Sequence, residues 1–95
     1  MSDKLETAIA RGARAEELLR SEILQEAFAT LETEYINFWK VTAARDSEAR
    51  EKLWLATQIV GKVRAHLATV VNNGRLAQRE LDDLANGRGR RFGII

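Results

Sequence analysis

Apolar residues recur along the chain at alternating intervals of three and four, the spacing of an amphipathic α-helix. This pattern predicts helices over 3–20, 22–42 and 47–73 and a short fourth helix over 75–85. In the second and third ranges the repeat is about 3.5 residues, as in a coiled-coil seam. We therefore expect an all-α fold. The seam positions are Leu24, Phe28, Leu31, Tyr35 and Phe38 in the second helix and Leu53, Ala56, Val60, Val63, Leu67 and Val70 in the third.

The two seams match when the chain folds back at 43–47. Phe38 then faces Leu53 and Phe28 faces Val63, so that large residues meet smaller ones. We expect an antiparallel helical hairpin of 22–42 and 47–73. Two helices enclose only one thin seam, and domains this small need further burial. The hairpin is therefore expected to be oligomeric.

Capping residues predict where the helices begin and end. Ser21 is a candidate N-cap that separates the first two helices, and Asp46 or Ser47 begins the third. Asn72-Asn73-Gly74 is a helix-stop signal, because glycine adopts the left-handed C-terminal cap. We expect a break there, although one helix through Gly74 also fits the spacing at a cost of about 1 kcal/mol. Asn86-Gly87 ends the fourth helix, which predicts a single helical domain over 1–86 and a basic and apolar tail over 87–95.

Several apolar residues lie off the seam, and they are the candidates for partner contacts. The first helix can cover part of this surface, and self-association the rest. Gly61 and Ala65 form a small pair on the third helix where another helix could approach. Two tryptophans fall near the same end of the hairpin, where they either close the core or form a docking surface. The candidate partner-binding residues are Trp39, Trp54 and Ile59, with Phe92, Ile94 and Ile95 in the tail.

The residue composition argues against catalytic chemistry. The 95 residues include no cysteine and one histidine, which excludes disulfides, thiolate zinc sites and multi-histidine metal cages. His66 has no nucleophile or orienting acid in a recognisable motif. The Glu-x-x-His pattern of di-metal bundles does not occur. We expect no enzyme activity, no metal and no cofactor.

Charge is balanced overall but unevenly distributed. The net charge is +1 for the chain, −3 for residues 21–42, +2 for 43–74 and +2 for 75–95. An acidic helix beside a basic one favours pairing with each other or with a second copy. A total of +1 is low for a protein that neutralises phosphates, so nucleic-acid binding is the alternative function. Its candidate contacts are Arg75, Arg79, Arg88, Arg90 and Arg91.

No apolar run approaches the roughly 20 residues that cross a bilayer. The first residues, Met-Ser-Asp-Lys, lead into a charged helix rather than a signal-peptide core. We therefore expect a cytoplasmic protein with no membrane partner.

Three stretches, 14–28, 48–55 and 63–67, carry a resemblance to short helical proteins. Such proteins are encoded by tailed bacteriophages and prophage-like elements among their head-assembly and DNA-packaging genes, and some are small packaging (terminase) subunits. The resemblance implies a non-enzymatic helical homo-oligomer with a phage particle or packaging protein as partner, in the host cytoplasm or associated with the virion. This chain lacks the N-terminal DNA-binding helix-turn-helix of those subunits.

Overall fold

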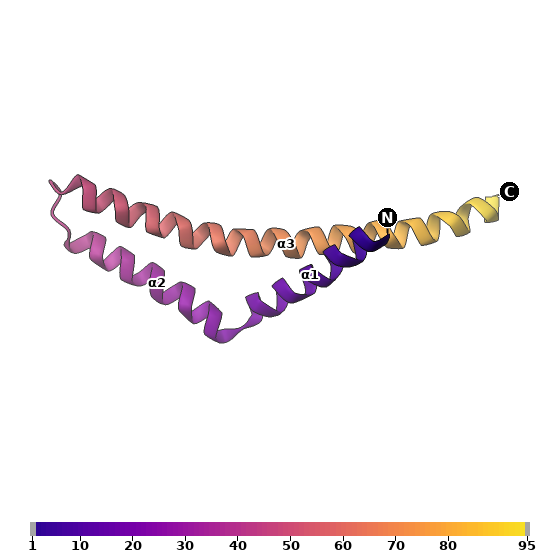
Figure 1. The fold of residues 1–95 in the computed structure, drawn as a ribbon, viewed down its shortest axis with the longest axis horizontal. Coiled ribbons are helices and arrows are strands. Elements are labelled where there is room, and N and C mark those ends of the chain that lie inside the picture. The colour runs from indigo at the N-terminus through magenta and orange to yellow at the C-terminus, as the bar shows by residue number, and fades with distance from the viewer. Residues whose placement is uncertain (1, 95) are drawn as a thin grey trace. The chain divides into compact units, whose positions relative to one another are not determined.

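The computed structural model describes the backbone of residues 2–94 and the side chains of residues 3–87. This part of the chain forms three helices and no strand, which confirms the all-α prediction (Figure 1). Helix α1 spans Ser2–Arg20, α2 spans Glu22–Val41 and α3 spans Ser47–Ile94. None of these helices, within the described residues, is both long and apolar enough to cross a membrane.

The boundary between α1 and α2 lies at Ser21, as its capping chemistry predicts. Ser21 has extended backbone angles, φ −65° and ψ 120°, and its hydroxyl oxygen accepts a hydrogen bond from the Leu24 N–H at 3.3 Å. The side chain thus satisfies one of the free N–H groups at the start of α2.

The connection between α2 and α3 is held by caps on both sides. The Thr42 N–H donates to the carbonyls of Phe38 and Trp39 at 3.1 and 3.3 Å, and its hydroxyl donates to the Phe38 carbonyl at 2.6 Å. Asp46 Oδ1 accepts from the Ala49 N–H at 3.2 Å, so Asp46 is the N-cap of α3. Helix α2 therefore ends, and α3 begins, where nearby residues supply hydrogen-bond partners for the free backbone groups.

The predicted break at Asn72-Asn73-Gly74 is wrong, because α3 runs without interruption from Ser47 to Ile94. No described glycine has a positive φ, so Gly74 is not a left-handed cap. It is buried instead, and a Cβ placed on it would lie 2.9 Å from the Gly12 Cα. The predicted stop at Asn86-Gly87 is also wrong, since the helical backbone continues past it.

The chain divides into two compact units. The first unit holds residues up to Glu17 together with those from Leu67 onward. Its buried apolar residues are Ala15, Val71 and Ala77, and small side chains let the α1 and α3 backbones come close at Gly12. The separation of a domain over 1–86 from a tail over 87–95 stays a prediction.

The second unit, Leu18–His66, contains α2 and the first part of α3. Phe28 and Val60 are its buried apolar residues, at 6% and 8% exposure. Three predicted seam residues, Leu31, Phe38 and Val63, are instead exposed at 37%, 59% and 48%. The other eight predicted seam residues are buried or half-buried, so the packed face lies close to the predicted seam. The half-buried Glu32 and Arg64, next to Leu31 and Val63 in the sequence, also lie in it.

Candidate functional site

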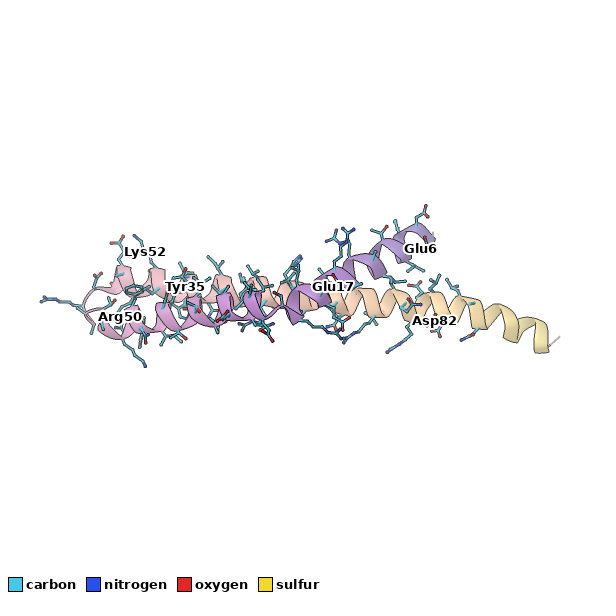
Figure 2. The ribbon with its side chains drawn as sticks, turned by 90° about the horizontal axis from the view of Figure 1, so that it is seen from below. Glu6, Glu17, Tyr35, Arg50, Lys52 and Asp82 are labelled. Carbon is cyan, nitrogen blue, oxygen red and sulfur yellow. The ribbon has the colours of Figure 1, made fainter. Side chains whose placement is uncertain are left out.

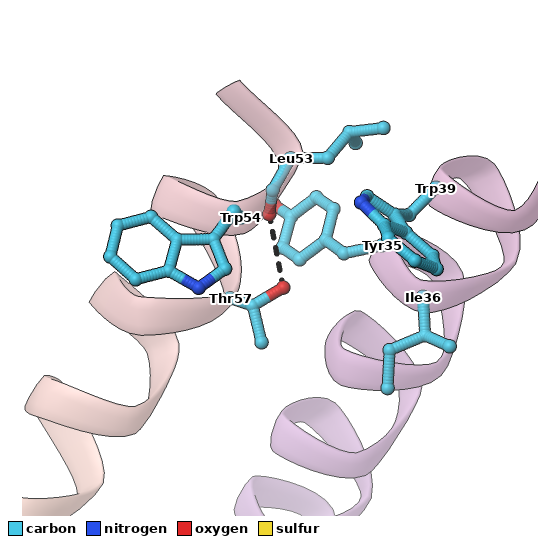
Figure 3. Close-up of a pocket in the computed structure, with 6 residues that line it drawn as sticks. All are labelled: Tyr35, Ile36, Trp39, Leu53, Trp54 and Thr57. Carbon is cyan, nitrogen blue, oxygen red and sulfur yellow. Dashed lines mark hydrogen bonds between the residues drawn. The ribbon is translucent and has the colours of Figure 1, made fainter. Parts of the chain in front are cut away.

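A shallow apolar hollow of about 160 Å³ lies on the second unit. Figure 3 shows the phenol ring of Tyr35 reaching from α2 toward α3, with an indole on either side of it in this view. The floor of the hollow is apolar. The Thr57 hydroxyl donates a 3.0 Å hydrogen bond to the Leu53 carbonyl. We call this site the tryptophan hollow, and its lining residues are Tyr35, Ile36, Trp39, Leu53, Trp54 and Thr57.

Arg50 fixes one wall of the tryptophan hollow. Its guanidinium carbon lies 3.9 Å from the centre of the Trp39 ring, a cation–π contact. The same group donates to the carbonyls of Trp39 and Thr42 at 3.3 and 3.1 Å. These carbonyls lie in the last turn and at the C-cap of α2, where carbonyl groups lack the regular helical partner, and the Trp39 carbonyl also accepts from the Thr42 N–H. Figure 2 shows Arg50 close to the connection between α2 and α3.

The structure brings two of the three predicted partner-binding residues in the second unit together. Trp39 and Trp54 line the same hollow and remain 43% and 58% exposed. Ile59 is 60% exposed and does not line the hollow. Indole rings that are held in place yet left in contact with water are typical of binding surfaces.

Sequence analysis missed a polar cluster on the packed face of the second unit. Arg64 Nη1 forms an ion pair with Glu32 Oε1 at 2.9 Å, and its guanidinium carbon lies 4.9 Å from the centre of the Phe28 ring. The apolar stem and planar head of arginine can pack on an aromatic ring. The opposite charges of α2 and α3 were the only sequence signal for this pair.

The first unit holds the two described candidates for phosphate contact. Arg75 Nη2 pairs with Glu16 Oε1 at 3.2 Å, beside the close approach of Gly12 and Gly74. Arg79 is exposed. The remaining candidates lie outside the side chains that the structure describes: Arg88, Arg90, Arg91, Phe92, Ile94 and Ile95.

The described residues contain no cluster of metal-binding side chains. His66 is exposed on α3. Across the part of the chain searched, no three histidine or carboxylate side chains gather where they could hold a metal ion. What the site can offer is an apolar surface with two indoles, which suits docking of another apolar surface.

The chain was also compared with known proteins. Nothing among protein-family models, curated proteins or solved structures matches it.

Proposed function

We propose that this protein is a non-enzymatic assembly protein that acts by helix-mediated self-association and by docking to a partner. The setting we propose is the head assembly or DNA packaging of a tailed phage or phage-like particle. That setting rests on the sequence resemblance alone, and a portal or large-packaging-subunit gene beside this one would support it.

The observation that supports the assembly role is that the second unit exposes far more large apolar side chains than it buries. Among its described residues, two apolar side chains are buried and eleven large ones are exposed. An exposed apolar surface built from this many large side chains on a small unit favours a partner that covers it. Trp39 and Trp54 lie at one point of that surface, and tryptophan is the residue type most enriched among residues that dominate binding energy.

We further propose that α2 and the first part of α3 pair as an antiparallel hairpin that presents this surface. The order of contacts supports the pairing: Phe28, in the first half of α2, and Glu32, near its middle, contact Arg64, late in the unit. Trp39, late in α2, contacts Arg50, near the start of α3. A rigid pair of helices loses little further freedom when it docks.

Light scattering after size-exclusion chromatography tests the assembly role. The wild-type chain is expected to elute at a multiple of its 10.7 kDa mass. Trp54→Ser is expected to weaken association at least tenfold, since it removes a central indole. Leu76→Ser is the matched control, because Leu76 is exposed to nearly the same extent, 59%, but lies in the first unit.

A monomer of the wild-type chain at high micromolar concentration would refute the assembly role. Binding of a DNA duplex at low salt, lost steeply as salt rises, would instead favour the nucleic-acid alternative. Arg79→Ala would then reduce that binding.

A further inference from the structure

Two described glycines of α3, Gly61 and Gly87, have open space where a side chain would stand, and Gly61 is the one in the second unit. A Cβ on Gly61 would meet no atom within 4 Å, and no described glycine has a positive φ. A glycine inside a helix is unfavourable relative to alanine. Gly74, on the same helix, differs because the Gly12 backbone occupies the place of its side chain.

Gly61 shares a face of α3 with part of the tryptophan hollow. It lies two helical turns after Trp54, and Ala65 follows one turn later, so these residues form one line. On α2, Ala29 precedes Ile36 of the hollow by the same two turns. Small side chains at Ala29, Gly61 and Ala65, all exposed, thus border exposed indoles. This combination lets a helix approach closely at one end of the surface and bury aromatic rings at the other.

The net charges of the helices indicate which helices of two copies would meet. Residues 21–42 carry four glutamates and one lysine, whereas residues 43–66 carry five basic and three acidic side chains. Contact of α2 with α2 would therefore bring together two helices of net charge −3. Contact of α2 with the other copy's α3 instead brings opposite charges together.

We propose that the face containing Trp39, Trp54, Gly61 and Ala65 binds a second copy of this chain about a two-fold axis parallel to the helices. This interface rests on the proposed self-association. The α2 helix of each copy lies across α3 of the other, and Ala29 of one copy approaches Gly61 and Ala65 of the other. Every neighbouring helix in the resulting four-helix bundle runs antiparallel.

Ile59 lies outside this interface. It precedes Gly61 by two residues, about 200° around the helix, and is 60% exposed. Its side of α3 stays available in the dimer.

Sedimentation equilibrium of Gly61→Leu tests the choice of face. We expect a wild-type dimer and a Gly61→Leu monomer, because leucine fills the place of the approaching helix. Leucine is the better helix former, so the monomer should keep its helical circular dichroism and unfold at no lower temperature. Gly87→Leu is the matched control, since Gly87 also has open space around it in the chain but lies in the first unit; it should stay dimeric.

Persistence of the Gly61→Leu dimer, or loss of the dimer in Ile59→Lys instead, would overturn this interface while leaving self-association intact. A wild-type monomer would refute the proposed function itself, so the two failures are distinguishable. Orientation is tested by oxidation of cysteine variants, since the chain has no cysteine of its own. Ala29→Cys combined with Ala65→Cys should give a covalent dimer and Ala65→Cys alone should not, whereas rapid crosslinking of the single variant would place α3 against α3 and contradict the proposal.

Discussion

Gly61 and Gly74 occupy the same helix, yet the two units use them in opposite ways. At Gly74 the backbone of α1 comes so close that a Cβ would lie 2.9 Å from the Gly12 Cα and 3.0 Å from the Ala8 carbonyl oxygen. At Gly61 nothing beyond its own turn of helix lies within 4 Å of that position. Gly74 is explained by a contact inside the chain, and Gly61 is not.

The same contrast holds for the larger side chains. In the first unit Ala15, Val71 and Ala77 are buried, and Leu76 and Leu84 are its only exposed large apolar residues among those described. The second unit has the larger apolar residues but buries little beyond Phe28 and Val60. Small residues thus complete the packing of the first unit from within, whereas the second unit leaves most of its large apolar side chains exposed.

Phe28→Ala is expected to have the largest effect on this comparison. Phe28 is the largest buried side chain of the second unit, with the Arg64 guanidinium over its ring. Removal of the ring leaves a cavity and should lower the free energy of unfolding by about 3 kcal/mol, the low end for buried phenylalanines. Urea unfolding followed by circular dichroism measures the change.

Phe38→Ala is the matched control, because Phe38 is 59% exposed on the same helix. Phe38→Ala should lower the free energy of unfolding by about 0.5 kcal/mol, as other surface substitutions do. Equal losses at the two positions would mean that the second unit buries both phenylalanines and has less free surface than we infer.

Those two phenylalanines also mark the limit of what the sequence predicts. Both occupy seam positions in the repeat, but only Phe28 is buried. The repeat identifies the helix and its approximate apolar face, whereas the exact rotation depends on which side chains pack best across it. Here the half-buried Glu32 and Arg64 lie on the packed face while their neighbours Leu31 and Val63 are exposed. A pattern of apolar residues alone does not indicate that charged side chains lie there.

Helix ends were predictable where their cause is local. The caps at Ser21 and Asp46 use acceptors within three residues of the N–H groups that they bind. The error at Gly74 has a distant cause, because Gly12 is far away in the sequence. A glycine at a helix end and a glycine at a helix–helix contact look alike in one sequence.

The candidate site was predictable in part. Counting residues back from the turn brings Trp39 and Trp54 to the same end of the two helices, and both line one hollow. The role of Arg50 was not predictable from the repeat, because its contacts are with carbonyls at the end of α2 and with the face of an indole.

Alanine at the two glycines should change stability in opposite directions. Gly74→Ala forces its methyl group against backbone atoms of α1, and crowding of this kind costs up to about 3 kcal/mol against a helix-propensity gain of about 1. We expect a net loss of about 1–2 kcal/mol. Gly61→Ala meets open space and should gain about 0.5–1 kcal/mol.

Both variants should be unfolded in urea at a concentration below self-association, so that dimer contacts do not enter the comparison. Hydrogen exchange shows which part of the chain each substitution destabilises. Gly74→Ala should accelerate exchange in α1, and Gly61→Ala should not. A stabilising Gly74→Ala would show that the two backbones separate readily and that the close contact is not what holds α1.

The smallest effects are expected from the two interhelix ion pairs, each measured by a double-mutant cycle. Glu32 and Arg64 are 2.9 Å apart with side chains 32% and 39% exposed, whereas Glu16 and Arg75 are 3.2 Å apart and Arg75 is 66% exposed. Screening by water weakens the more exposed pair. Glu32→Gln with Arg64→Met should reveal a coupling of about 1 kcal/mol, and Glu16→Gln with Arg75→Met about 0.3 kcal/mol.

Molar salt separates these pairs further, because it screens exposed charges more strongly than partly buried ones. The Glu16–Arg75 coupling should then vanish while part of the Glu32–Arg64 coupling remains. This second coupling also tests the proposed hairpin, since Glu32 and Arg64 lie on different helices. Zero coupling between them at low salt would mean that α2 and α3 do not hold this register in solution, and the surface inferred from it would lose its support.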